Sequence, residues 1–167
     1  MLESLQIPLD LIAARSLVLQ PEAEDPVVAE IGVNGREHRL VPAAAKAWRK
    51  LRSAAESDGV TLRIVSAFRS VDRQAEIVRA KLARGLSLKA ILAVSAPPGY
   101  SEHHSGRAVD VTTEGVPPLE LEFEETRAFG WLSNNARRFG FVLSFPRRNP
   151  NGYAFEPWHW YFETSEV

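Results

Sequence analysis

The 167-residue chain contains no cysteine. This absence excludes disulfide bonds, thiolate metal sites and cysteine nucleophiles together. A bound metal would therefore have to be held by histidine, aspartate or glutamate, a ligand set that suits divalent cations. The chain has only four histidines for such a site, at positions 38, 103, 104 and 159.

The chain also lacks an excess of charge of either sign, because 20 Lys and Arg residues face 21 Asp and Glu residues. A formal net charge of −1 creates no global field that would attract nucleic acid or an anionic membrane, so we expect neither as a partner. The adjacent pair Arg147 and Arg148 is typical of a solvated loop tip.

Long hydrophobic runs are missing as well, and none approaches the length needed to span a bilayer. The first residues carry Glu3 and Asp10 and show no basic start before an apolar stretch, so they do not resemble a signal peptide. This pattern is compatible with a cytoplasmic protein, with delivery to its site of action by another route, or with a leader that has been removed.

What is present suits one globular domain, since 45% of the residues are hydrophobic and 25% are charged. Residues 1–26 are weakly patterned and interrupted by three prolines, so we expect a surface segment there. Residues 27–167 are predicted to form a single domain, and we expect a monomer.

Turn and cap signals divide this region into short elements. Asn34-Gly35 predicts a hairpin over 27–40, and Ser70 and Ser87 can cap two of the helices. Helices are predicted over 42–57, 70–84, 87–94 and 124–139, strands over 61–68, 108–113, 141–145 and 158–162, and a loop over 95–105. Because strands and helices do not alternate regularly, we predict an α+β fold with a mainly antiparallel central sheet flanked by helices.

The first segment with chemical potential runs from Ser101 to Asp110, in the sequence SEHHSGRAVD. His103 ends a loop rich in proline and glycine, Gly106 permits a sharp turn, and Asp110 lies within an apolar strand. A carboxylate in such a strand is costly unless it is paired or binds a metal. This segment alone is equally compatible with an Asp110–arginine ion pair beside a loop histidine.

The second segment is Glu156-Pro157-Trp158-His159-Trp160. Pro157 biases Glu156 to an extended backbone, which can direct a carboxylate and an imidazole to one point. The alternative is a core histidine among aromatic residues. Together the two segments supply two histidines, an aspartate and a spare glutamate, which matches a catalytic zinc with three ligands, an open position and a nearby base.

The pattern Ser101-x-His103-x-x-Gly106-x-Ala108-x-Asp110, followed by Glu156-x-x-His159, resembles the VanY-type D-alanyl-D-alanine carboxypeptidases. These belong to the superfamily that also includes lysostaphin-type peptidases and the hedgehog signalling domain. The resemblance runs from about residue 66 to residue 162. It implies that His103, Asp110 and His159 bind one zinc ion and that Glu156 is the catalytic base.

Ser66-Ala67-Phe68-Arg69-Ser70 resembles the Ser-x-Tyr-Arg-Ser segment of that family, with Phe68 replacing tyrosine. The resemblance implies that Arg69 meets the substrate, either clamping a carboxylate or stabilising an oxyanion. A structural ion pair is the alternative for Arg69. Gln74 matches a frequent family glutamine, and Gln74 and Ser101 are further substrate-binding candidates.

The sequence departs from the family pattern at two places. Tyr161-Phe162 stands where arginine and tyrosine often follow the last motif, which puts details of substrate binding in doubt, and His104 stands where many relatives carry glutamine. We expect His104 to be a supporting or loop residue.

The resemblance implies a zinc carboxypeptidase that removes the terminal D-alanine from peptidoglycan stem peptides. Alternatives within the enzyme class are an L,D-carboxypeptidase, a D-Ala-D-Ala dipeptidase and a phage-type peptidoglycan endopeptidase. A zinc-bearing binding domain without catalysis is a further alternative. Glu156 and Arg69 argue against it, because a binding domain needs no base.

Overall fold

The computed structural model describes residues 1–163. Its α-helices are α1 (Leu9–Ala14), α2 (Pro42–Ser57), α3 (Val71–Ala83), α4 (Leu88–Val94) and α5 (Arg127–Asn135). Short 3₁₀ helices are η1 (Glu3–Leu5), η2 (Glu102–Ser105), η3 (Leu121–Glu125) and η4 (Ala136–Phe139). The strands are β1 (Val27–Ile31), β2 (Glu37–Leu40), β3 (Arg63–Ser66), β4 (Ala108–Thr112), β5 (Phe141–Leu143) and β6 (His159–Phe162).

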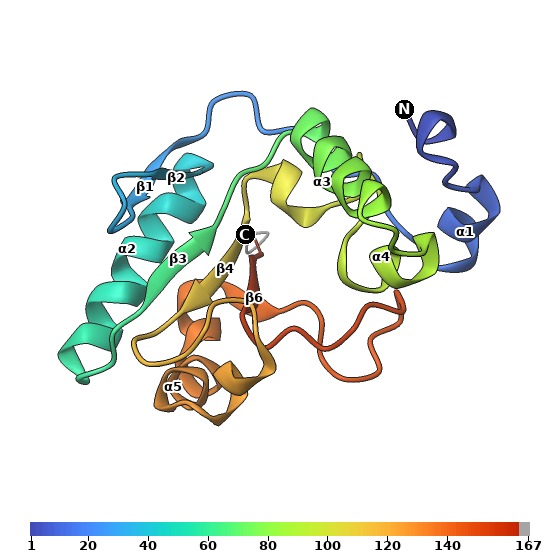
Figure 1. Ribbon diagram of the computed structural model, residues 1–167. Coiled ribbons are helices and arrows are strands. Elements are labelled where there is room, and N and C mark those ends of the chain that lie inside the picture. The colour runs from blue at the N-terminus through green and yellow to red at the C-terminus, as the bar shows by residue number, and fades with distance from the viewer. Residues whose placement is uncertain (164–167) are drawn as a thin grey trace.

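Four strands form the central sheet in the order β3-β4-β6-β5, and every neighbouring pair is antiparallel. β1 and β2 form a separate antiparallel hairpin. In Figure 1, α2 and this hairpin lie on one side of β3 and β4, whereas α1, α3 and α4 gather on the other side. The predicted α+β fold with an antiparallel sheet is therefore confirmed.

The larger hydrophobic core lies between α2, the sheet and α5. Pro42 begins α2 at a position where its missing N–H costs nothing, and Trp48, Leu51 and Ala55 recur on the face that is buried. The Trp48 ring meets the edge of Phe141 at a centroid distance of 6.2 Å. This core supports the sheet from the side opposite α3 and α4.

A second hydrophobic cluster joins the N-terminal segment to α3 and α4. Leu5, Ile7 and Ile12 are buried there against Val78 and Ile91, among others. The sequence predicts a surface segment over residues 1–26, and the structure adds that these three side chains are buried. Their spacing shows no regular period, and their partners come from distant parts of the sequence, so the sequence carries no local signal of their burial.

Several predicted boundaries also differ from the structure. α5 begins at Arg127 and not at 124, because the Thr126 hydroxyl accepts a hydrogen bond from the Phe129 N–H and caps the helix there. The predicted loop over 95–105 contains η2, and the strands of the sheet are shorter than predicted. Within residues 1–163, no helix combines the length and the apolar character needed to cross a membrane. The last four residues of the predicted domain lie outside the described residues.

Candidate functional site

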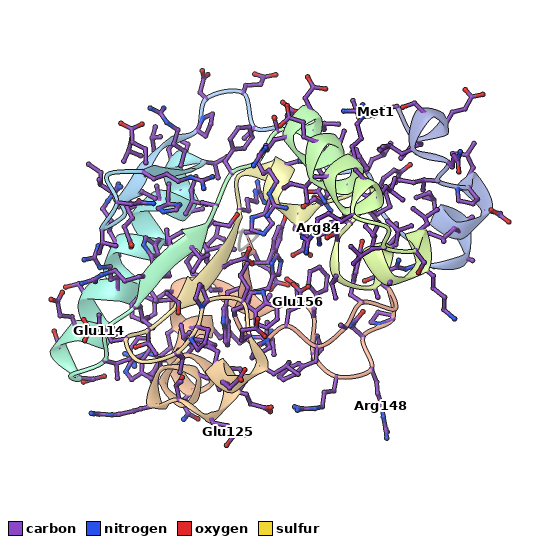
Figure 2. The ribbon with its side chains drawn as sticks, viewed as in Figure 1. Met1, Arg84, Glu114, Glu125, Arg148 and Glu156 are labelled. Atoms are coloured by element: carbon purple, nitrogen blue, oxygen red, sulfur yellow. The ribbon has the colours of Figure 1, made fainter. Side chains whose placement is uncertain are left out.

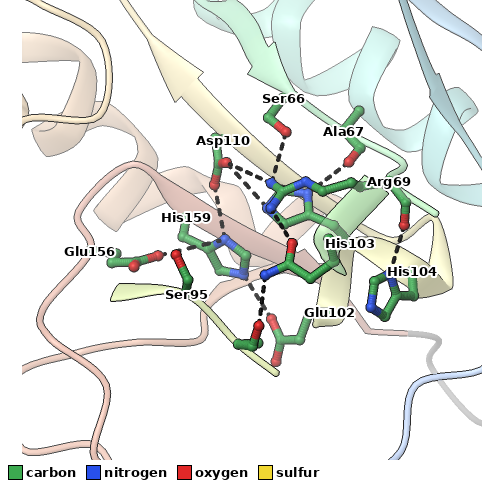
Figure 3. Close-up of polar contacts among 12 residues, drawn as sticks. Ser66, Ala67, Arg69, Ser95, Glu102, His103, His104, Asp110, Glu156 and His159 are labelled. Carbon is green, nitrogen blue, oxygen red and sulfur yellow. Dashed lines mark hydrogen bonds and ion pairs between the residues drawn. The ribbon is translucent and has the colours of Figure 1, made fainter. Parts of the chain in front are cut away.

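Strand register brings two of the predicted ligands onto one face of the sheet. Ser66 on β3 pairs with Asp110 on β4, and Asp110 pairs with His159 on β6. Directly paired residues on antiparallel strands project to the same side. Asp110 and His159 therefore meet although 48 residues separate them in the sequence. Figure 3 shows this row together with the groups that surround it.

The turn at Gly106 brings His103 over β4. Gly106 has a φ of 65°, and a Cβ at this position would lie 3.0 Å from the Ala23 Cβ and 3.2 Å from the Val41 backbone nitrogen. Both the left-handed backbone and the close approach favour glycine. Because the chain turns at Gly106, His103 Nε2 lies 3.2 Å from Asp110 Oδ2.

The other ring nitrogen of His103 is occupied by the backbone. His103 Nδ1 lies 2.7 Å from the Ala67 carbonyl oxygen, which can only accept, so Nδ1 carries the proton. The ring is buried, and burial is the main cause that lowers the pKa of His103. The imidazole is therefore neutral, with Nε2 free to act as a ligand.

His159, unlike His103, has a carboxylate at each of its two ring nitrogens. Its Nδ1 lies 2.9 Å from Asp110 Oδ1, and its Nε2 lies 2.8 Å from Glu102 Oε2. The Phe145 ring stacks on the imidazole at a centroid distance of 4.6 Å. Burial alone would lower the pKa of His159, but the two carboxylates outweigh it and raise this pKa to about 10. With Nε2 bonded to Glu102, Nδ1 is the atom that faces the site.

Glu102 is a residue that the sequence did not identify. It stands at an unspecified position of the motif, next to His103, and nothing in that spacing connects it to His159. Only the fold brings the two side chains together. The sole available signal was an acidic residue between two site residues.

The three predicted ligands suit a single metal ion. One ligand atom from each of His103, Asp110 and His159 lies within 4.8 Å of the others, and all three residues are buried. Metal–nitrogen and metal–oxygen bonds of about 2.0–2.2 Å in a tetrahedral site separate ligand atoms by roughly 3.3 Å, which is close to the 2.9 and 3.2 Å seen around Asp110. The donor set therefore fits a divalent metal such as zinc.

Glu156 lies beside this cluster without belonging to it. Its Oε2 is 4.0 Å from His159 Nδ1. Its backbone N–H donates to the Phe145 carbonyl, and its own carbonyl accepts from the His159 N–H. Burial raises the pKa of Glu156 to about 7, which suits a group that must both take and release a proton near neutrality. In Figure 2 the Glu156 label lies near the middle of the view, whereas the exposed Arg148 side chain projects from the lower edge.

Arg69 approaches the cluster from the end of β3. Its Nη1 donates to Gln74 Oε1 at 2.7 Å, and its Nη2 donates to Ser66 Oγ at 3.1 Å and lies 4.0 Å from Asp110 Oδ2. Gln74 is itself buried and donates to the Ala96 carbonyl at 2.7 Å. In this structure Gln74 thus orients Arg69.

His104 and Ser101 occupy the neighbouring loop. The His104 ring is fully buried, donates from Nδ1 to the Arg69 carbonyl and accepts from the Gly99 N–H at Nε2. His104 therefore connects the loop to the backbone of Arg69. Ser101 is buried and lines the cavity beside His103.

A cavity of about 830 Å³ opens onto the candidate ligands, Glu102, Glu156, Arg69, Gln74 and Ser101, but His104 does not line it. Its walls come from both sides of the molecule: the sheet and η2 supply the candidate ligands, whereas α3 and the end of α4 supply polar and basic side chains. Such a volume accommodates a short peptide or a similar small ligand. The tyrosine hydroxyl of Tyr153 also lies on this wall, buried and without a hydrogen-bond partner among residues 1–163.

Comparison with known proteins identifies the family that the chain resembles. Residues 37–165 match the family model described as VanY, D-alanyl-D-alanine carboxypeptidase. The D-alanyl-D-alanine carboxypeptidase of Enterococcus faecalis (strain ATCC 700802 / V583) is 33% identical over 120 residues, which cover 66% of this chain and 43% of the relative. The chain thus spans less than half the length of that relative.

Two solved structures share the fold. The LdcB LD-carboxypeptidase aligns with a TM-score of 0.76 and 30% identity, covering 87% of this chain and 71% of that one. A D,D-pentapeptidase VanY from a VanB-type vancomycin resistance cassette, solved in complex with Zn(II), aligns with a TM-score of 0.64 and 29% identity, covering 89% of this chain and 88% of that one.

Proposed function

Because this chain belongs to the VanY family of D-alanyl-D-alanine carboxypeptidases, we propose that it is a zinc-dependent carboxypeptidase that removes the terminal D-alanine from peptidoglycan stem peptides. One observation carries this proposal. Two buried histidines and an aspartate converge within 4.8 Å, and the Glu156 carboxylate lies 4.0 Å from one of them. A metal ligand set with an adjacent carboxylate of raised pKa is the arrangement that peptide hydrolysis requires.

The metal role is assigned to His103 Nε2, Nδ1 of His159 and the Asp110 carboxylate. Zinc held there would supply a Lewis acid that makes water more acidic and polarises the scissile carbonyl. The VanY structure in complex with Zn(II) supports this choice of metal. Asp110 suits the role because, although burial would raise its pKa, the two histidines outweigh this and lower it well below its usual range.

Glu156 and Arg69 act on the substrate in this proposal. Glu156 takes a proton from the attacking water and passes it to the leaving amine of D-alanine. Arg69, held by Gln74 and Ser66, presents positive charge to the oxygen that becomes negative as the carbonyl is attacked. Ser101 lines the cavity at the same place and is proposed to contact the peptide.

An L,D-carboxypeptidase is the second candidate, and one observation favours it. The LdcB LD-carboxypeptidase aligns with the higher TM-score of the two structures, 0.76 against 0.64. The two activities differ in the configuration of the residue before the scissile bond, so substrate hydrolysis separates them directly.

The test is hydrolysis of three peptides by the purified chain, with and without zinc: one ending in L-Lys-D-Ala-D-Ala, one ending in L-Lys-D-Ala, and free D-Ala-D-Ala. Zinc-dependent release of one D-alanine from the first peptide alone supports the proposal. Cleavage of the second peptide indicates the L,D activity, and cleavage of the third indicates a dipeptidase. A zinc-loaded chain that cleaves none of them would be a binding domain or an endopeptidase, which an intact muropeptide would distinguish.

A further inference from the structure

Helix α3 presents two polar side chains to the same short segment of chain. Gln74 Nε2 donates to the Ala96 carbonyl at 2.7 Å, and Lys81 Nζ donates to the neighbouring Ser95 Oγ at 2.6 Å. The two residues are seven positions apart, which is two helical turns, so they share one face. Gln74 also binds Arg69. Lys81 and Gln74 thus contact neighbouring residues, and Gln74 also holds Arg69.

Lys81 lines the same cavity as the candidate metal ligands and is half-buried. Within residues 1–163 it has no carboxylate within ion-pair distance; the only partner of its ammonium is the Ser95 hydroxyl. Arg73, on the same helix, is in contrast exposed and paired with Glu76 at 2.8 Å. Burial, followed by the nearby charge of Arg69, lowers the pKa of Lys81. The Glu156 carboxylate opposes this shift from beyond ion-pair distance. A partly buried cation without a contacting counter-ion is costly, and a bound anion would offset this cost.

Arg69 and Lys81 both line this cavity but differ in how firmly they are held: Arg69 contacts two side chains and lies near a carboxylate, whereas Lys81 contacts one hydroxyl. Arg69 already donates to Gln74 and Ser66 and lies near Asp110. The Lys81 ammonium has three donors, and one is used by Ser95. Arg69 is therefore arranged as a fixed charge beside the reacting groups, whereas Lys81 can accept a new anionic partner.

We propose that Lys81 and the Ser95 hydroxyl form a carboxylate-binding subsite for the peptide substrate, separate from Arg69. The inference rests on the proposed peptidase function and specifies which end or side chain of the peptide is recognised. The carboxylate can come from two sources: the free C-terminus of the peptide, or the side chain of an acidic residue upstream of the scissile bond.

The experiment measures peptide binding by calorimetry in a zinc-loaded Glu156→Gln background, so that hydrolysis does not interfere. The ligands are N-acetyl-L-Lys-D-Ala-D-Ala, its C-terminal amide, and both forms extended by an upstream glutamate. The Glu156→Gln chain is the parent, and Lys81→Met in this background is compared with it. Lys81→Arg retains the charge, and Lys89→Met is the matched control, because Lys89 is exposed on α4 and does not line the cavity.

If the subsite takes the C-terminus, Lys81→Met weakens binding of the free-acid peptides by roughly tenfold to a hundredfold and leaves the amides unchanged. If the subsite takes a side chain, Lys81→Met weakens binding of both peptides that contain the upstream glutamate, whether their C-terminus is a free acid or an amide. In either case Lys81→Arg restores most of the affinity and Lys89→Met has no effect. Equal affinities of Lys81→Met and its parent for all four peptides would overturn the inference.

Zinc content and melting temperature distinguish substrate binding by Lys81 from a structural role. If Lys81 only binds the substrate, both quantities are unchanged in Lys81→Met. A uniform loss for all peptides together with a lower melting temperature, seen also in Lys81→Gln, would overturn the subsite as well. The proposed function has its own readout, zinc-dependent cleavage by the unmodified chain. If that chain cleaves peptides while Lys81→Met matches its parent, only the subsite is wrong; if it neither binds nor cleaves any peptide, both fail.

Discussion

The imidazole of His159 is held between two carboxylates, Asp110 at Nδ1 and Glu102 at Nε2. A carboxylate on the far nitrogen of a ligating histidine fixes the ring and its tautomer and makes the ligating atom more basic, and removal of such partners costs about tenfold to a hundredfold in metal affinity. We therefore predict that Glu102→Ala weakens zinc binding by about this factor, as measured by competition with a chromophoric chelator.

The matched control for Glu102 is Glu76→Ala, because Glu76 is an exposed glutamate of α3 whose one ion-pair partner among residues 1–163 is Arg73. It should bind zinc as tightly as the unmodified chain. If Glu102→Ala instead keeps its zinc affinity and shows only a raised KM, Glu102 contacts the peptide and does not position His159.

The same contacts predict a proton release when zinc binds. In the metal-free chain the pKa of His159 is about 10, because its two carboxylate partners outweigh burial, so the ring is protonated at neutral pH. A histidine must be deprotonated to ligate a metal. Below this pKa, zinc displaces the proton, and the apparent affinity rises with pH by up to about tenfold per unit for this group. Calorimetry at pH 8 in buffers of different ionisation enthalpy measures the release.

At pH 8 Glu156, with a pKa of about 7, is already mostly ionised and contributes little to this signal. Glu102→Ala removes one of the two contacts that raise the pKa of His159, so fewer protons should be released. Binding heats that do not depend on the buffer would contradict the assignment of a protonated His159.

We expect Glu156 to move protons without holding the metal. Its carboxylate is 4.0 Å from His159 Nδ1, and the three ligand atoms converge without it. Glu156→Gln should therefore keep zinc and fold but reduce kcat by about 10²–10⁴-fold. Zinc content and turnover of the same preparation check this, and loss of zinc along with activity would show that Glu156 is a ligand.

At the scale of single residues, the sequence identified those site residues that stand out by residue type or by motif spacing. Asp110 is unusual within an apolar strand, and the motif around His159 repeats a family pattern, so both could be identified from the sequence. Glu102 and Lys81 could not be identified, because their roles depend on which side chains from other elements lie opposite them.

At the scale of elements, local signals located most helices and strands. Ser70 and Ser87 accept hydrogen bonds from the N–H groups three residues on, as helix caps do. The register that aligns Asp110 with His159 could not be predicted in the same way, since strand pairing depends on packing across the whole sheet. The motif spacing indicates that the residues are related, but only the sheet determines how they meet.

The N-terminal segment shows most clearly that hydrophobic periodicity does not reveal every buried side chain. The contribution of this segment to stability can be tested. Leu5 is 2% exposed in the cluster with α3 and α4, whereas Leu9 in the same segment is 71% exposed. Leu5→Ala should lower the free energy of unfolding by about 2–5 kcal/mol, while Leu9→Ala should change it by less than about 0.5 kcal/mol. Denaturant unfolding measures both. Equal, small effects would mean that the segment contributes little to the stability of the fold.

At the scale of the whole molecule, two separate hydrophobic clusters support the elements that line the site. The larger cluster supports β4 and β6, and the smaller one supports α3 and α4, which form the opposite wall of the cavity. The candidate ligands on β4 and β6 and the polar side chains of α3 that face them thus belong to elements with separate cores.

A metal ion held by the candidate ligands would join parts of the chain that are far apart, since these residues come from η2, β4 and β6. The unfolded chain cannot hold these three groups together, so zinc should bind mainly the folded state and stabilise it. At a free zinc concentration about 100 times the Kd, the gain is about 2.7 kcal/mol, which corresponds to a rise in Tm of roughly 5–10 °C for a chain of this size.

Thermal unfolding over a series of buffered zinc concentrations tests this prediction. The Tm should rise with zinc, fall when a chelator is added and recover on reloading. His103→Gln removes one ligand and should make the Tm nearly independent of zinc, whereas His38→Gln should retain the full response, because His38 lies on β2 outside the cavity. If the unmodified chain and His103→Gln respond to zinc alike, the stabilising ion is bound elsewhere, and the three residues do not form the metal site.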